Sequence, residues 1–239
     1  MFNTVEIEIN HACNLSCSYC PNHFYERSEK GLMTNEQFHH IILQLKEINF
    51  SGRLSFDFYN EPTMHPKLKD FIKFAHETLP QINTLLYSNG TLLSSDKIDQ
   101  LFLAGLTKLV VTQHEESSGR DFSYLKNVTW KDQLVLQSHH VLKKTNRSGS
   151  VAKLNRGQQI GAPCFIPSKI LSISLKGNIT SCFEDFHQEI TFGNVFEKSI
   201  KEIWSSDNFI EFRKSLSLGF RAKYPTCSRC SRIETLNIH

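Results

Sequence analysis

The segment HACNLSCSYCPN, residues 11–22, places Cys13, Cys17 and Cys20 within eight residues. It follows VEIEI, residues 5–9, whose alternation of apolar and polar residues predicts a β-strand. The three cysteines therefore lie on the loop after the first predicted strand. Three thiolates from one short loop can bind three irons of a [4Fe-4S] cluster and leave the fourth iron open to a ligand. A zinc site or buried thiols are the alternative interpretation.

Strands and helices alternate after this loop. Apolar spacing predicts helices over residues 34–48, 65–79 and 94–105, and further strands over 54–59, 84–88, 108–113 and 132–142. Short loops join them. This order predicts an α/β fold with a parallel sheet and right-handed crossovers.

Polar residues gather where the predicted strands end. They are the cysteine loop, Asn60-Glu61-Pro62, Ser88-Asn89-Gly90 and Gln113-His114. Parallel α/β folds bind their ligands at the carboxyl edge of the sheet. We therefore expect these four segments to meet at one site.

The pattern changes in the last third of the chain. Residues 143–163 are rich in Gly, Asn and basic residues, which predicts a linker. A hairpin is expected over 170–182 and a helix in two pieces over 199–219. Four cysteines remain, Cys164, Cys182, Cys227 and Cys230. They could hold a structural zinc ion or a fully ligated [4Fe-4S] cluster, and their spacing does not separate the two.

Composition narrows the class of protein. The chain has 239 residues, 39% hydrophobic content and a net charge of +3 without a long basic run. We therefore expect no nucleic-acid partner. No signal peptide and no apolar stretch of membrane-spanning length is present, so a cytoplasmic protein without a membrane partner is expected. Cytoplasmic thiols stay reduced, which favours metal binding for the seven cysteines.

The cysteine loop resembles the CxxxCxxC signature of the radical S-adenosylmethionine superfamily, with Tyr19 as the aromatic residue before the last cysteine. The resemblance implies a partial (β/α)6 TIM-like barrel. It also implies that the open iron binds the amino and carboxylate groups of S-adenosylmethionine. Electron transfer from a flavodoxin or ferredoxin would then release a 5′-deoxyadenosyl radical.

The same resemblance suggests further cofactor-binding residues. Glu61, in YNEP where the family often has GGEP, would accept a hydrogen bond from the cofactor's amino group. Ser88 and Asn89 match a Ser-Asn-Gly motif near the ribose and methionine, and Gln113 is a candidate ribose contact. Strand-end turns, and a surface position for Gln113, are the alternatives.

The C-terminal part resembles the SPASM/Twitch extension of this superfamily, in its short Twitch form with one auxiliary cluster. The resemblance implies two domains, a radical SAM barrel over 1–155 and a small α+β auxiliary-cluster domain over 156–239. It assigns Cys164, Cys182, Cys227 and Cys230 to a second [4Fe-4S] cluster. No cysteine then remains as a nucleophile.

A fully ligated auxiliary cluster favours electron loss from a substrate radical, so the resemblance implies a two-electron oxidation. Compact Twitch dehydrogenases that act on amino-cyclitols match in length and cysteine pattern. In them an Arg before the auxiliary cluster lies at the substrate hydroxyl, and Arg147 is the preferred match. Arg156 is the competitor, and a solvated linker charge is the alternative for both. A peptide-modifying radical SAM enzyme and a non-catalytic metal-binding adaptor are the other hypotheses for function.

Overall fold

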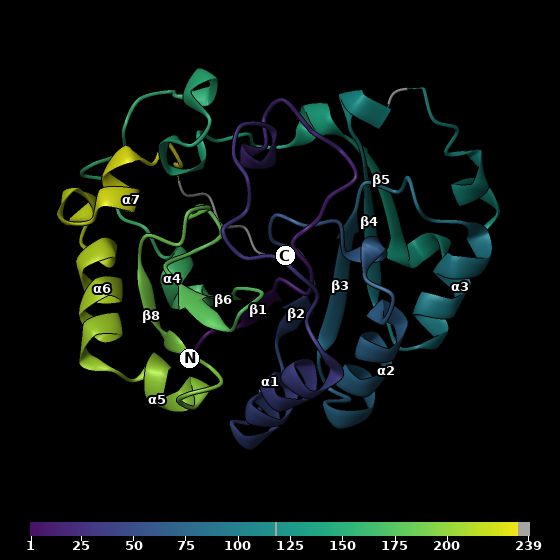
Figure 1. The fold of residues 1–239 in the computed structure, drawn as a ribbon, viewed down its shortest axis with the longest axis horizontal. Coiled ribbons are helices and arrows are strands. Elements are labelled where there is room, and N and C mark those ends of the chain that lie inside the picture. Colours follow the sequence, from purple (N-terminus) through teal and green to yellow (C-terminus); the bar gives the residue numbers. More distant parts are fainter. Residues whose placement is uncertain (118, 234–239) are drawn as a thin grey trace.

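A computed structural model describes residues 1–117 and 119–233 of the chain. All of its strands join one sheet, in the order β5-β4-β3-β2-β1-β6-β7-β8 (Figure 1). The strands are β1 (Thr4–Ile7), β2 (Arg53–Ser55), β3 (Asn83–Ser88), β4 (Lys108–Gln113), β5 (Leu134–Ser138), β6 (Ile170–Ile173), β7 (Asn178–Thr180) and β8 (Thr191–Asn194). Pairing from β5 through β6 is parallel, and β7 and β8 are antiparallel. The predicted α/β class is confirmed, and a partial barrel is consistent with this sheet.

Helices α1 (Asn35–Glu47), α2 (Leu68–Thr78) and α3 (Ser95–Leu103) connect the first four strands. Thr34 begins α1 with a capping box, in which its hydroxyl accepts from the Gln37 backbone N–H and the Gln37 side chain accepts from the Thr34 backbone N–H. At α3, the Ser94 hydroxyl caps the helix by accepting from the Lys97 N–H. The connection from β4 to β5 contains only short 3₁₀ turns.

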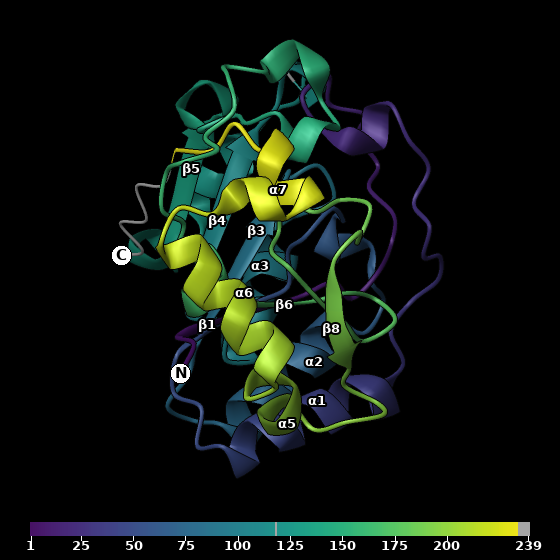
Figure 2. The same ribbon diagram turned by 90° about the vertical axis from the view of Figure 1, so that its left-hand side faces the viewer.

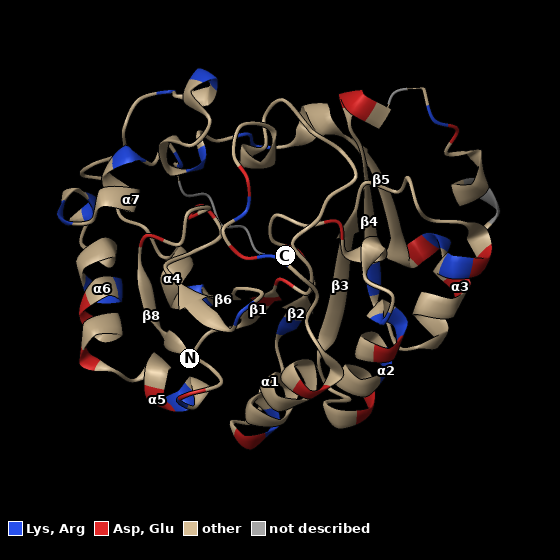
Figure 3. Ribbon diagram, viewed as in Figure 1, with Lys and Arg blue, Asp and Glu red and all other residues tan. Residues whose placement is uncertain are grey.

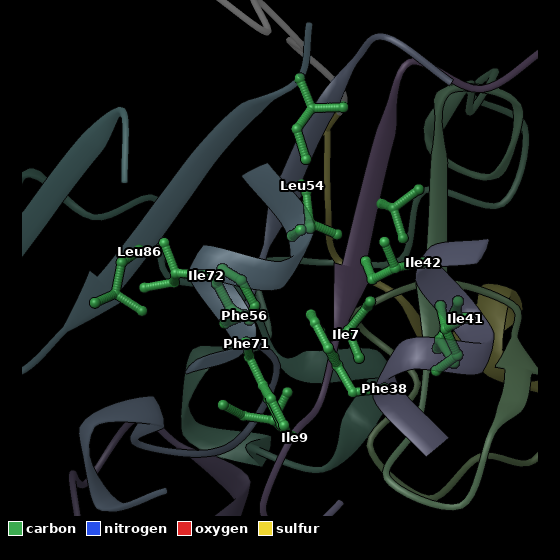
Figure 4. Packing of buried hydrophobic residues seen from close by; sticks show 14 of the residues in the cluster. Ile7, Ile9, Phe38, Ile41, Ile42, Leu54, Phe56, Phe71, Ile72 and Leu86 are labelled. Carbon is green, nitrogen blue, oxygen red and sulfur yellow. The ribbon is translucent and has the colours of Figure 1, made fainter. Parts of the chain in front are cut away.

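The main core lies between the sheet and these helices (Figure 4). Ile7 on β1 and Phe56 after β2 are fully buried against α1 and α2. Phe38 and Phe71 stack at 4.2 Å between ring centroids and join the two helices. Truncating one of these rings to Ala would cost about 3–5 kcal/mol of stability. This rigid layer fixes the strand ends on which the site is built.

The C-terminal part extends the same sheet. Strand β6 lies parallel to β1, and the predicted hairpin follows as β6 and β7. Helices α5 (Ile200–Trp204) and α6 (Asp207–Ser217) are the two predicted pieces, and α4 (Ile166–Lys169) and α7 (Pro225–Arg229) are single turns. Figure 2 shows α6 and α7 on one face of the molecule. The domain boundary after residue 155 stays a prediction, and residues 234–239 of the predicted second domain lie outside the described residues.

The linker prediction for residues 143–163 is wrong for the first half of that segment. Thr145, Asn146 and Val151 are buried. The Asn146 side chain donates to the Arg229 carbonyl at 2.7 Å and accepts from the Ser231 N–H at 3.0 Å. The polar residues of this segment suggest exposure to solvent, but they instead form hydrogen bonds with backbone groups of the C-terminal tail. The predicted strand over 132–142 also ends early, because His139 and His140 begin a 3₁₀ turn.

No helix within residues 1–117 and 119–233 combines the length and apolar character needed to cross a membrane.

Candidate active site

The three cysteines of the first loop line one pocket at the carboxyl ends of the parallel strands. Cys13, Cys17 and Cys20 share this pocket of about 230 Å³, called the three-thiol pocket below. The loop is held to the sheet because the Ala12 carbonyl accepts from the Glu61 N–H at 2.9 Å and from the Asn10 side chain at 2.9 Å. The sheet edge therefore positions the thiols.

The surroundings of these thiols favour their neutral form. Burial raises the pKa of Cys13 to about 11, and burial also raises the pKa of Cys17 and of Cys20. A metal centre here must therefore displace the thiol protons. In the described part of the chain, no three His, Cys, Asp or Glu side chains converge on a point that could hold a metal ion. A cubane binds each thiolate through a different iron, so a shared pocket is the arrangement it needs.

Glu61 lies at the back of the three-thiol pocket and is 2% exposed. Its Oε1 atom accepts from the Thr63 hydroxyl at 2.5 Å and the Ser88 hydroxyl at 2.8 Å. Its Oε2 atom accepts from the Asn89 N–H at 2.8 Å. The two motifs predicted separately from sequence thus form one hydrogen-bond network, which holds the carboxylate in a fixed orientation.

Asn89 connects this network to the cysteine loop. Its side chain donates to Asn14 Oδ1 at 2.9 Å and approaches the Cys13 sulfur at 3.9 Å. Gly90 follows with φ of +72°, and a Cβ atom there would lie 2.6 Å from Val111. Only glycine fits this turn, which brings the Asn89 amide beside the loop.

Tyr19 and the end of β4 form one wall of the pocket. The Tyr19 hydroxyl is hydrogen-bonded to His114, and the Lys144 ammonium lies 4.3 Å from the Tyr19 ring centroid. Thr112 and His114 line the three-thiol pocket, whereas Gln113 lines a separate hollow with His139 and His140. Side chains alternate along a strand, which places Gln113 in a different hollow from Thr112. The contact of Gln113 with the cofactor stays a prediction.

Arg147 also lines the three-thiol pocket, about one third exposed. It has a φ of +47°, in the left-handed region that costs energy for a residue with a side chain. Its guanidinium lies 3.6 Å from Glu184 and 5.6 Å from the Tyr59 ring centroid. Arg156, the competitor, is exposed. The structure brings Arg147, and not Arg156, to the pocket, while its catalytic role stays a prediction.

The other four cysteines surround a second cavity. Cys164, Cys182, Cys227 and Cys230 line a cavity of about 20 Å³, called the four-thiol cavity below. The Cys182 sulfur accepts from the Glu184 N–H and the Cys230 sulfur from the Arg232 N–H, each at 3.4 Å. Such N–H···S bonds are typical of iron–sulfur sites and tune their potentials.

Arg221 is a residue that the sequence reasoning missed. It is 2% exposed and lines the four-thiol cavity. Its Nε, Nη2 and Nη1 atoms donate hydrogen bonds to the carbonyls of Ala162 at 2.7 Å, Pro163 at 3.0 Å and Arg232 at 2.8 Å, respectively. These carbonyls flank Cys164 and Cys230. One buried cation therefore holds the backbone on two sides of the cavity, and no local sequence pattern marks it.

Glu184 was also missed, although it stands two residues after Cys182. It is 1% exposed and accepts from the Thr145 hydroxyl and from Arg232, both at 2.7 Å. Burial alone would raise the pKa of Glu184, but Arg147 and Arg232 hold it below its usual value. The Arg147–Glu184 pair therefore stands between the three-thiol pocket and the four-thiol cavity.

Comparison with known proteins agrees with this geometry. The family model of the radical SAM superfamily matches residues 7–149, more than half of the chain. The chain belongs to the radical SAM superfamily. The model of the SPASM iron–sulfur cluster-binding domain matches residues 164–231, which contain all four cysteines of the second cavity.

Individual relatives narrow the comparison. The S-adenosyl-L-methionine-dependent 2-deoxy-scyllo-inosamine dehydrogenase of Niallia circulans is 32% identical over 98% of this chain and 94% of its own length. The crystal structure of BtrN in complex with AdoMet and 2-DOIA superposes with a TM-score of 0.92, at 32% identity, over 100% of this chain and 96% of that one. The PqqA peptide cyclase of Bradyrhizobium diazoefficiens is 33% identical, but over only 45% of this chain and 27% of its own.

The chain is thus a radical SAM enzyme of the SPASM/Twitch type, with S-adenosylmethionine and iron–sulfur clusters as its cofactors. The donor chemistry of both sites fits such clusters, because each cavity is lined by a set of thiols that can ligate iron. The assignment of individual residues to the cofactors stays a prediction.

Proposed function

We propose that this enzyme oxidises a secondary alcohol of an amino-cyclitol or a related sugar to a ketone. The observation that carries the proposal is the Arg147–Glu184 pair, which lies between a three-thiol pocket and a four-thiol cavity. The full-length likeness to a 2-deoxy-scyllo-inosamine dehydrogenase supports the substrate class. A peptide substrate has less support, because the peptide cyclase match covers a small part of that protein.

The bound groups supply a 5′-deoxyadenosyl radical for hydrogen abstraction and an acceptor for one electron. Cys13, Cys17 and Cys20 would hold the first [4Fe-4S] cluster, with Glu61 accepting from the amino group of S-adenosylmethionine. The remaining four cysteines would hold the second. We propose two clusters, an electron donor such as flavodoxin or ferredoxin, and a cytoplasmic location.

Arg147 would hold the substrate hydroxyl oxygen. A guanidinium keeps its charge and does not act as a base, but it stabilises oxygen as the hydroxyl proton leaves. The adjacent Glu184 carboxylate keeps Arg147 in place through their 3.6 Å contact. The pair therefore gives the pocket a fixed cation where alkoxide character develops.

The rest of the pocket suits a small polyol with an amine. Asp57 lines the three-thiol pocket, and its Oδ1 atom is buried with no hydrogen-bond partner among the described residues. The pocket opens into a second hollow of about 460 Å³ that is lined by Asp57, Glu6 and Tyr87 among others. Burial raises the pKa of Glu6 to about 8. These carboxyl and phenol groups can bind hydroxyl and ammonium groups of a ligand.

The test is an anaerobic incubation of the reconstituted enzyme with dithionite, S-adenosylmethionine and 2-deoxy-scyllo-inosamine. We expect 5′-deoxyadenosine and an amino-ketone in comparable amounts. Substrate deuterated at the oxidised carbon should transfer deuterium to 5′-deoxyadenosine. If 5′-deoxyadenosine forms without deuterium and without ketone, this substrate class is wrong.

A further inference from the structure

Exposed apolar side chains gather beside the four-thiol cavity. Ile160 and Phe165 are each 43% exposed, Leu218 is 60% exposed and Phe220 is 59% exposed. Two of them flank Cys164 in the sequence, and the other two follow α6. We call these four residues the auxiliary patch. Large apolar side chains scattered singly need no explanation, but a group around one site often marks an interface.

The two segments that carry the auxiliary patch are in direct contact. The Cys164 N–H donates to the Leu216 carbonyl at 2.9 Å. Gly219 has a φ of +87°, and a Cβ atom there would lie 2.4 Å from the Gly161 carbonyl oxygen. Arg221, next to Phe220, donates to the Ala162 carbonyl. The two segments therefore lie side by side, next to the four-thiol cavity, which Cys164, Leu216 and Arg221 line.

The two chain segments that carry the auxiliary patch are basic. Residues 148–183 and 212–233 contain no Asp or Glu. Figure 3 shows blue segments at and near α7, and one acidic residue, Glu189, pairs with Arg229 of that helix. The basic residues in these two ranges are Lys153, Arg156, Lys169, Lys176, Arg213, Lys214, Arg221, Lys223, Arg229 and Arg232.

Only part of this charge is neutralised. Lys223 pairs with Glu211 at 3.1 Å. Arg229 pairs with Glu189, and Arg232 pairs with Glu184. Lys153, Arg156 and Lys214 are exposed and belong to none of the ion pairs formed by residues 1–117 and 119–233. An acidic protein surface would therefore be attracted to this face.

We propose that the auxiliary patch docks a small acidic one-electron carrier protein of the flavodoxin type. The inference rests on the proposed oxidation, which leaves one electron on the auxiliary cluster in each turnover. An oxidised flavin carrier would take that electron together with one proton and become its semiquinone. Complexes between redox partners are small and transient, which a patch of four apolar side chains with a basic rim can support.

Two other occupants fit less well. A second copy of this chain would bring two basic rims together, and like charges at an interface oppose association. An anionic lipid surface would be attracted by the same charge, but it would give no reason for the position of the patch beside the four-thiol cavity. Both are separate outcomes of the test.

The test measures binding of oxidised flavodoxin to the reconstituted enzyme by calorimetry at low and moderate salt. The first variant is the double substitution Leu218→Ser and Phe220→Ser, and the second is Arg156→Glu with Lys214→Glu. We expect the first to weaken binding about tenfold, as for loss of interface anchors. The second should weaken binding and reduce its salt dependence. Leu103→Ser on α3, where the residue is 77% exposed, is the matched control and should change nothing.

Equal affinity for the patch variants and the control would overturn the proposal. So would a dimer that the same variants dissolve in sedimentation velocity, or binding to vesicles with anionic lipids but not to flavodoxin. Iron content, measured on each variant, confirms that the clusters are intact. The proposed function is tested separately with dithionite, so a lack of ketone and a lack of docking are distinguishable.

Discussion

The two thiol sites of this enzyme differ in what they leave open. The three-thiol pocket has about 230 Å³ and is lined by polar groups from several strand ends, whereas the four-thiol cavity has about 20 Å³. A site with three thiolates and free volume can bind a further ligand at the metal, whereas a site with four thiolates and little free volume cannot. In the proposed function, this difference would separate cofactor activation at the first site from electron acceptance at the second.

The two sites also differ in how the chain gathers them. The three cysteines of the pocket come from one loop of residues 13–20, which strand-end hydrogen bonds hold in place. The four cysteines of the cavity come from segments as far apart as Cys164 and Cys230, and Arg221 bridges them. Removing the three cysteines of the pocket should therefore abolish activity with little effect on stability. Removing the four cysteines of the cavity should lower the stability of the fold as well.

The largest expected effects come from removing each set of thiols. Replacing Cys13, Cys17 and Cys20 with Ala should lower the iron content by about four atoms and abolish cofactor cleavage. Replacing Cys227 and Cys230 with Ala should also lower the iron content by about four, but leave cleavage measurable without ketone formation. Iron analysis, Mössbauer spectra and 5′-deoxyadenosine yield measure both. Cleavage retained in the first variant would contradict the division between the two sites.

Arg147→Ala should have the next largest effect, because Arg147 stands where the two sites meet. We expect ketone formation to fall about 100-fold, as for removal of one preorganised donor at a developing oxyanion. Cofactor cleavage without product should change little. Arg156→Ala is the matched control, since Arg156 is exposed. An equal loss in both variants, or in neither, would remove Arg147 from the chemistry.

Much of this site could be predicted from sequence, because its residues stand at strand ends with short spacing. The cysteine loop, Glu61 and the Ser88-Asn89-Gly90 turn all meet as parallel-sheet geometry requires. The direction of the Gln113 side chain could not be predicted, because a strand end predicted from sequence does not fix which neighbour lines the pocket. The next residue along the chain, His114, lines the three-thiol pocket.

Other features could not be found from one sequence. Arg221 bonds to carbonyls about 60 residues away, and nothing near it in the chain indicates this. The segment around Asn146 has a loop composition but packs on a tail that is 83 residues later in the sequence. A polar segment is exposed to solvent only when no buried backbone group elsewhere in the fold needs it as a hydrogen-bond partner.

Glu61→Gln tests whether the hydrogen-bond network serves the cofactor. The Gln side chain would replace one of the two carboxylate oxygens of Glu61 with an NH2 donor. This donor would face either the Ser88 and Thr63 hydroxyls or the Asn89 N–H. We expect the Kd for S-adenosylmethionine to rise about tenfold, which corresponds to about 1.4 kcal/mol. The iron content should not change. Glu77→Gln on the exposed face of α2 is the control, and unchanged affinity in the Glu61 variant would exclude this carboxylate from the cofactor site.

Substitutions of Arg221 should have the smallest effect on activity, and two of them separate the role of the side chain's shape from the role of its charge. Arg221→Lys keeps the charge but can reach fewer of the three carbonyls, so stability should fall by about 2 kcal/mol and Tm by about 4–8 °C. Arg221→Gln also removes the positive charge beside the four thiols, which should lower the potential of the auxiliary cluster. Arg156→Lys controls for the change of side chain. Calorimetry measures Tm, and a redox titration followed by electron paramagnetic resonance measures the potential. If both variants keep the wild-type potential, Arg221 only holds the backbone, and the four-thiol cavity depends on it for shape alone.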